Sequence, residues 1–172
     1  MIIPIFSFLI SVFLRAEGYL VPSTIEWKRI PTLSPRTFRI SYKNIKLNLG
    51  TVFMIETKIS ERMDIYLQSD LEKSDIPLHI SVRPEKEEAI VFNSFVRNAW
   101  DFEERRRIPF SFNSVMSLRI KIEESRFLIR IGENWFKSFE HRVPFKLIEQ
   151  LYIVGFKDIP LLEVTDNEGI EL

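Results

Sequence analysis

The chain has 172 residues, of which 45% are hydrophobic and 13% aromatic, so it can build one sizeable core but is too short for two ordinary domains. Its 24 lysines and arginines balance its 24 aspartates and glutamates, which leaves no net field to attract phosphates over a distance. We therefore expect one domain, and we do not expect nucleic acid as a partner.

The first 14 residues form an apolar run. As a helix this run would span about 20 Å, short of the roughly 30 Å hydrocarbon core, so we expect no stable transmembrane span. Small residues at Ala16 and Gly18 suit a signal peptidase, although no Lys or Arg precedes the run. We predict a signal peptide over residues 1–18 and a secreted protein. The alternative is an N-terminal strand or signal anchor that stays attached, with a cytoplasmic location if the segment is no signal peptide.

Residues 19–45 contain Pro22, Pro31 and Pro35 and show no clear periodicity. We predict an extended lead-in that wraps the domain. The sequence has no cysteine, so a secreted form would rely on its core without disulfides.

From about residue 50 onward, apolar residues alternate with polar ones, the period that places side chains on opposite faces of a strand. Residues 62–68, 115–122 and 126–131 show this pattern over their whole length, and residues 123–125 have the length of a hairpin loop. Further strands are expected near residues 51–59, 77–83, 88–93 and 151–156. The one helix-like stretch, residues 144–150, is short enough to be a single turn. These short strands and regular turns predict an all-β, two-sheet antiparallel sandwich.

The predicted strand at 77–83 separates its residues into two kinds. Leu78, Ile80 and Val82 alternate with a polar trio formed by His79, Ser81 and Arg83. The trio spans roughly 13 Å and offers an imidazole, a hydroxyl and a guanidinium, groups that suit sugar hydroxyls. The alternative is an ordinary solvated outer face.

The residues that follow carry a resemblance. Three segments follow one another in a fixed order: Ile90-Val-Phe-Asn93-Ser94, Trp100-Asp-Phe-Glu103-Glu-Arg105 and Pro109-Phe110. Together they resemble the signature of the galectins, lectins that bind β-galactosides. Residues 136–144 and 151–155 resemble later motifs of the same family. The resemblance covers roughly residues 46–165, which implies a galectin-like carbohydrate-recognition domain there, with a jelly-roll, concanavalin-like fold and a tail at 166–172.

The resemblance implies roles for individual residues. His79 and Arg83 would hold the axial 4-hydroxyl of galactose, and Asn93 would bind the 6-hydroxyl. Trp100 would lie against the apolar face of the galactose ring, where burial and weak C–H contacts favour the correct epimer.

At the rim, the resemblance implies that Glu103 and Arg105 form an ion pair that reaches the next sugar. A pair that is already fixed loses less entropy on binding. Taken singly, each residue also has an ordinary explanation: Trp100 as a loop anchor, Asn93 as a turn residue, and the charged pair as a surface contact of under about 1 kcal/mol.

Two departures from the family pattern bear on affinity. Ser81 stands where the family usually has Asn, so a two-headed amide is replaced by one hydroxyl, which should weaken binding about tenfold without abolishing it. Asp101 replaces the Gly that usually follows the Trp, which would restrict the loop if that position needs a positive φ.

We expect a lectin and no enzyme, with no catalytic residue, cofactor or metal. The sequence has no nucleophilic Cys and no Gly-x-Ser-x-Gly, and the adjacent Glu103 and Glu104 would point in opposite directions on a strand. The expected partners are β-galactoside glycans of glycoproteins or glycolipids, and the resemblance makes a homodimer a further hypothesis. The alternative function is a galectin-fold interaction module with weakened or lost galactoside binding that engages another glycan or a protein.

Overall fold

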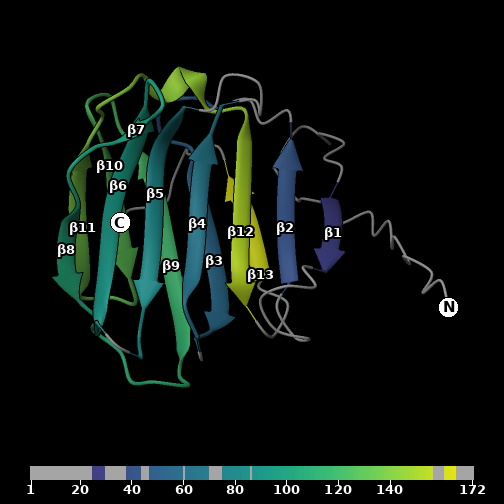
Figure 1. Cartoon of the computed structure of the whole chain (residues 1–172), viewed down its shortest axis with the longest axis vertical. Helices are drawn as coiled ribbons and strands as arrows, with labels where there is room; N and C mark the ends of the chain where they lie inside the picture. Colours follow the sequence, from purple (N-terminus) through teal and green to yellow (C-terminus); the bar gives the residue numbers. More distant parts are fainter. Residues whose placement is uncertain are drawn as a thin grey trace, which may run out of the picture.

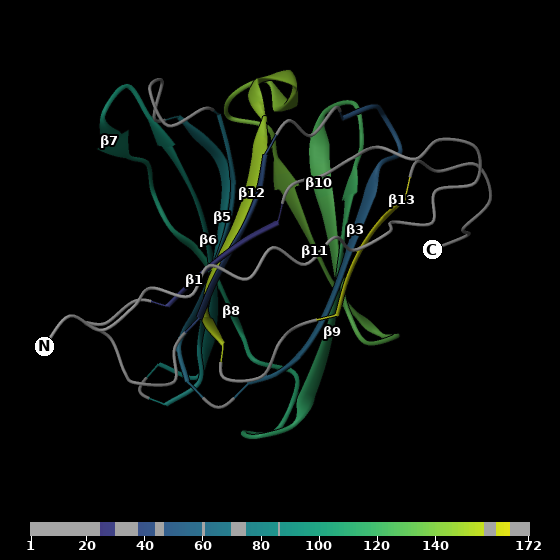
Figure 2. The ribbon, with the colours of Figure 1, turned by 90° about the vertical axis from the view of Figure 1, so that its right-hand side faces the viewer.

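The computed structural model describes residues 25–29, 38–43, 47–59, 61–69, 75–85, 87–156 and 161–165. Within these residues, the strands form two antiparallel sheets that face each other as the layers of a sandwich (Figures 1 and 2). This confirms the predicted all-β, two-sheet fold. The predicted signal peptide at 1–18 and tail at 166–172 lie outside the described residues and stay predictions.

The front sheet, nearest the viewer in Figure 1, contains eight of the described strands. Its order is β1 (Ile25–Arg29), β2 (Phe38–Lys43), β12 (Gln150–Phe156), β4 (Met63–Gln68), β5 (Ile76–Arg83) and β6 (Ala89–Val96). Two short strands, β7 (Ala99–Trp100) and β8 (Glu104–Arg107), pair with successive parts of the free edge of β6. The front sheet therefore ends in a loop that folds back along β6.

The back sheet contains five of the described strands, in the order β11 (Trp135–Glu140), β10 (Arg126–Ile131), β9 (Val115–Ile122), β3 (Val52–Lys58) and β13 (Leu161–Thr165). The hairpin predicted at 123–125 joins β9 to β10. The helix-like stretch at 144–150 proves to be one turn of 3-10 helix, η1 (Phe145–Leu147). The sequence-based strand predictions from residue 50 onward are thus confirmed, with ends that differ by a few residues.

The core lies between the sheets and consists of the apolar residues of the alternating pattern. Met63, Ile65 and Leu67 of β4 in the front sheet are almost fully buried. Leu118 and Ile120 of β9 in the back sheet belong to the same buried cluster. Burying one such side chain stabilises the fold by about 1.5–3 kcal/mol. The other face of the front sheet is left free for polar side chains.

The strand β12 contains a bulge between Val154 and Phe156, at Gly155. Gly155 has φ +93°, and a Cβ at this position would lie 2.2 Å from the carbonyl oxygen of Arg62. A side chain is therefore excluded here both by conformation and by space.

The strands β1 and β2 lie within residues 19–45, for which we predicted an extended lead-in. Both segments are extended, and β2 pairs with β12 along its whole length, so this part of the segment belongs to the front sheet. None of the described residues forms a helix long and apolar enough to cross a membrane.

Candidate functional site

The front sheet's face away from the core carries two rows of side chains that strand register sets side by side. We call this surface the polar face. The first row crosses β6, β5 and β4 and consists of Asn93, His79 and Tyr66. The second row crosses β8, β6, β5 and β4 and consists of Arg105, Val91, Ser81 and Asp64.

His79 is held on three sides. Its Nε2 lies 3.0 Å from Oδ1 of Asp64, and its ring stacks on Tyr66 with centroids 4.5 Å apart and planes 12° from parallel. The Trp100 ring lies 5.0 Å away on a tilt. These neighbours leave His79 only 5% exposed, so its ring has one fixed orientation.

Asp64 is buried but ionised. Arg62 donates to both carboxylate oxygens of Asp64, at 2.9 and 3.1 Å. Burial raises the pKa of the Asp64 carboxyl, but hydrogen bonds from His79, Arg62 and Ser81 outweigh it and lower the pKa to about 2. Asp64 therefore carries its charge throughout the physiological pH range.

Ser81 is fully buried beneath its neighbours. Its Oγ accepts a hydrogen bond from Nε of Arg83 at 3.0 Å. Ser81, which replaces the Asn usual in the family, therefore contacts Arg83 of the same strand. Only Nε of Arg83 is used in this contact, so its two terminal nitrogens can bind other partners.

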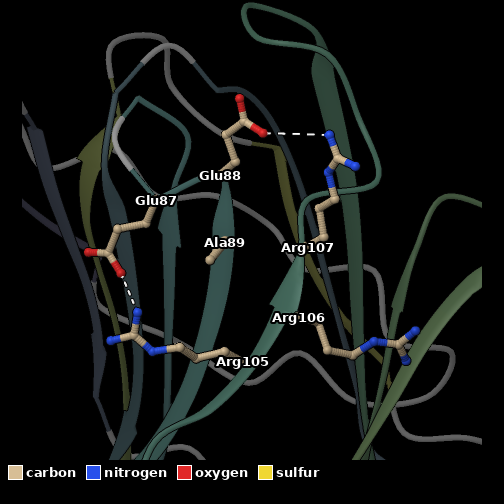
Figure 3. Close-up of a pocket in the computed structure, with 6 residues that line it drawn as sticks. All are labelled: Glu87, Glu88, Ala89, Arg105, Arg106 and Arg107. Atoms are coloured by element: carbon tan, nitrogen blue, oxygen red, sulfur yellow. Dashed lines mark hydrogen bonds and ion pairs between the residues drawn. The ribbon is translucent and has the colours of Figure 1, made fainter.

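Two arginines and two glutamates form a closed ring of ion pairs at one end of the polar face. Glu87 accepts from Nη1 of Arg83 at 3.1 Å. It also accepts from Nη1 of Arg105 at 2.6 Å (Figure 3). Glu103 accepts from Arg83 at 3.3 Å and from Nε of Arg105 at 2.9 Å. The hydrogen bond from Arg105 lowers the pKa of Glu103 against the opposing effect of its partial burial. The ring is uncharged overall and orients both guanidinium groups.

Beyond this ring lies an open pocket of about 290 Å³ lined by residues 87–89 and 105–107. Glu88 and Arg107 form a second ion pair across it, 3.6 Å apart, with both side chains largely exposed (Figure 3). Arg106 points to the opposite side, where it contacts the carbonyl oxygen of Phe136. The pocket therefore continues the polar face past Arg105.

Asn93 is buried, and its amide is largely committed to the protein. Its Oδ1 accepts from the backbone N–H of Ser94 at 2.8 Å and from Arg142 at 3.1 Å. Its Nδ2 donates to the carbonyl oxygen of Asp101 at 2.8 Å. One amide hydrogen is left over, so Asn93 can offer a ligand one donor.

Trp100 lies on β7 and is 50% exposed, with its ring 5.2 Å from Phe95 and 5.0 Å from His79. The next residue, Asp101, does not have a positive φ. The expected loop restriction at Asp101 is therefore absent. Instead, its Oδ1 accepts from the N–H of Phe102 at 2.8 Å, a local contact that suits the turn.

Arg142 reaches the same loop from the segment that follows β11 of the back sheet. It donates to Oδ1 of Asn93, to the carbonyl oxygen of Phe102 at 2.7 Å and to Glu104 at 2.8 Å. Its guanidinium also lies 3.9 Å from the centre of the Phe102 ring. Arg142 thus fixes the segment that presents Trp100.

All seven side chains predicted for the site lie on the polar face or its rim. They are His79, Ser81, Arg83, Asn93, Trp100, Glu103 and Arg105. One ring contact joins His79 to Trp100, and Asn93 lies beside His79 by strand register. A series of hydrogen bonds and ion pairs joins Ser81, Arg83, Glu103 and Arg105. The predicted Glu103–Arg105 ion pair is present, and Trp100 is surface-exposed as expected.

The alternative explanation of the strand at 77–83, an ordinary solvated outer face, does not match the structure. His79 and Ser81 are at most 5% exposed, and the neighbouring Asn93 is 4% exposed. The reason is that Tyr66, Trp100 and the arginines cover them, which a single strand's pattern does not reveal.

Three residues that contact the predicted site, Asp64, Glu87 and Arg142, were not predicted from the sequence. Asp64 is the outward residue of an ordinary amphipathic strand, and Glu87 belongs to a charged run at a turn, so neither stands out. Arg142 follows His141 in a motif that we had noted, but its contacts lie 49 positions away in the chain. Strand pairing was the missing signal in each case.

Glu104 and His141 lie apart from the polar face. Glu104 contacts Lys137 and Arg142, which outweigh burial and lower the pKa of its carboxyl, while Glu103 faces the ring of ion pairs. The two glutamates therefore point in opposite directions, as predicted. His141 packs on Phe127 and bonds to the carbonyl of Glu123.

Comparison with known proteins places this geometry in a family. The family model for galactoside-binding lectins matches residues 38–164. A 32 kDa beta-galactoside-binding lectin of Caenorhabditis elegans is 33% identical over 130 residues, which are 70% of this chain and 46% of that protein. The 32 kDa beta-galactoside-binding lectin of Haemonchus contortus is 39% identical over 99 residues, 56% of this chain and 35% of that protein. The chain thus spans less than half the length of either relative.

Solved structures agree on the fold. A toad ovary galectin in complex with thio-digalactose matches with a TM-score of 0.62 at 22% identity, covering 73% of this chain and 98% of that one. Galectin LEC-6 of Caenorhabditis elegans matches with a TM-score of 0.58 at 22% identity, covering 72% and 94%. Since the family model matches most of its length, this chain belongs to the galactoside-binding lectins, the galectin family.

Proposed function

We propose that this protein binds β-galactosides of the lactose and N-acetyllactosamine type on its polar face and catalyses no reaction on them. One observation carries the proposal: strand register places His79 opposite Asn93, with the half-exposed Trp100 ring beside them. A galactose ring stacked on Trp100 would meet polar groups along one edge and an apolar surface beneath it. That combination suits galactose, which has both an axial 4-hydroxyl and an apolar face.

In this proposal six of the seven predicted residues keep a sugar-binding role, and Ser81 becomes a supporting residue. His79 and Arg83 hold the 4-hydroxyl, and the spare amide hydrogen of Asn93 donates to the 6-hydroxyl. Arg105 and Glu103 bind the second sugar, since the ring of ion pairs holds them ready at low entropic cost. Ser81 supports Arg83 from below and does not itself contact sugar, because it is fully buried.

The absence of catalysis is proposed from the state of the carboxylates. Both carboxylates of the ring, Glu87 and Glu103, accept hydrogen bonds from two arginines, and the pKa of Glu103 is lowered. A glycosidase needs one carboxylic acid that holds a proton near neutral pH, which is the opposite perturbation.

The test is retention of the purified full chain on immobilised lactose, with elution by free lactose and with glucose as the control eluent. We expect elution by lactose alone. Trp100→Ala should abolish retention and leave the thermal midpoint nearly unchanged, because half of the ring is exposed. A large loss of stability in this variant would make Trp100 a core residue and overturn the site assignment.

A specific observation favours the second candidate, a galectin-fold module with weakened or lost galactoside binding. His79 Nε2 is occupied by Asp64, and Ser81 is inaccessible, so part of the expected polar set is already engaged. Failure of the folded protein to bind lactose would favour another glycan or a protein partner. Secretion and homodimerisation remain predictions, which N-terminal sequencing of the mature protein and light scattering would check.

A further inference from the structure

Asp64 is a buried charged residue that none of the assigned roles uses. It lies on β4 opposite Ser81 of β5, in the middle of the polar face, and is 8% exposed. A buried carboxylate is costly unless it is hydrogen-bonded, and Asp64 meets this requirement through side chains of the predicted binding set. Its position therefore links it to the sugar site.

The first link determines the state of His79. An ionised carboxylate only accepts hydrogen bonds, so the 3.0 Å contact with Oδ1 of Asp64 requires Nε2 of His79 to carry a hydrogen. In the neutral ring, Nδ1 is then the acceptor. Tyr66 stacks on the same ring and prevents it from turning out of this contact. Asp64 thus sets both the orientation and the tautomer of His79.

The second link runs through Ser81 to Arg83. The Ser81 oxygen accepts from Nε of Arg83 at 3.0 Å, and Ser81 lies directly opposite Asp64 in the pairing of β4 with β5, where its hydroxyl helps to lower the pKa of the Asp64 carboxyl. Ser81 therefore lies between the carboxylate and the guanidinium. Arg62 binds the same carboxylate from the other side and balances its charge.

We propose that Asp64 is a positioning residue of the binding site, which orders His79 directly and Arg83 through Ser81. This inference rests on the proposed galactoside-binding function. It also explains the Ser at position 81. An Asn there could contact both His79 and Arg83 by itself. The shorter Ser81 contacts Arg83, and Asp64 on the neighbouring strand contacts His79. The chain thereby keeps a preorganised pair of sugar-binding groups.

The binding experiment compares lactose affinity, measured by calorimetry, in the full chain and three variants. We expect Asp64→Ala to weaken binding by about tenfold or more, because two binding groups lose their orientation. Asp64→Asn keeps an acceptor of the same size and should lose less than about threefold. The double variant with Asp64→Ala and Ser81→Asn should recover most of the affinity, whereas a general structural defect would not be rescued.

A second readout needs no sugar. The sequence has two histidines, so the nitrogen-15 signals of the His79 ring can be assigned by comparison with His79→Gln. We expect the hydrogen on Nε2 in the unchanged protein and in Asp64→Asn, and a mixture of tautomers in Asp64→Ala. Unchanged His79 signals together with unchanged lactose affinity in Asp64→Ala would overturn the inference. If the unchanged protein fails to bind lactose while its His79 signals still depend on Asp64, the proposed function falls and the positioning of His79 by Asp64 stands.

Discussion

Replacing Arg142 should release the loop that presents Trp100. In the structure, Arg142 donates to Asn93, to the carbonyl oxygen of Phe102 and to Glu104, and its side chain is only 12% exposed. Hydrogen bonds to a charged group contribute about 1.5–3 kcal/mol each, but the loop carbonyl can regain a bond to water when Arg142 is removed. Arg142→Ala should therefore lower the free energy of unfolding by about 3 kcal/mol.

Lys137→Ala is the matched control. Lys137 also approaches Glu104 from the back sheet, at 2.6 Å, and its side chain is similarly buried, but it makes no hydrogen bond to Asn93 or Phe102. Its removal leaves Glu104 paired with Arg142 and should cost about 1 kcal/mol. The difference between the variants isolates the contacts with the loop.

The assays are urea unfolding and amide hydrogen exchange. The N–H of Asp101 donates to the carbonyl oxygen of Ser94 at 3.0 Å, so its protection reports whether the loop is closed. Exchange at Asp101 should accelerate about tenfold or more in Arg142→Ala and remain nearly unchanged in Lys137→Ala. Equal losses of stability and of Asp101 protection in both variants would refute the proposed role of Arg142.

Two further predictions concern stability. The folded-state pKa of Asp64 is about 2, below its ordinary value of 3.8, so its stabilising effect is complete above pH 4 and is lost as the pH falls toward 2. The difference in unfolding free energy between the unchanged protein and Asp64→Asn should therefore shrink by about 2 kcal/mol between pH 6 and pH 2, and a difference independent of pH would contradict the burial and pairing of this carboxylate. Gly155→Ala should destabilise the protein by about 3 kcal/mol or more, because its Cβ would collide with the Arg62 carbonyl at a φ of +93°. Gly132→Ala, at φ +58° in open space, should cost only about 1 kcal/mol, and equal thermal shifts for the two variants would show that the collision is relieved.

Local pattern determined much of this protein without any tertiary information. Alternation over 115–122 and 126–131 identified β9 and β10, because one buried face of a strand imposes a period of two wherever it occurs. The same rule placed His79, Ser81 and Arg83 on one face, since residues two apart in a strand share a side. Motif spacing then supplied Asn93, Trp100, Glu103 and Arg105 through the family resemblance.

Only the tertiary structure decided which residues meet across strands and sheets. Asp64 lies opposite Ser81 because of the register between β4 and β5. Arg142 contacts Asn93 because the segment after β11 of the back sheet lies against the edge of the front sheet. Neither pairing is encoded in local spacing. The burial of His79 and Ser81 also depends on these neighbours, since the exposure of a strand's outer face is set by what lies across it. The sequence alone therefore determined seven of the thirteen described strands, their faces and the family resemblance, and the fold decided which charges hold the predicted binding groups in place.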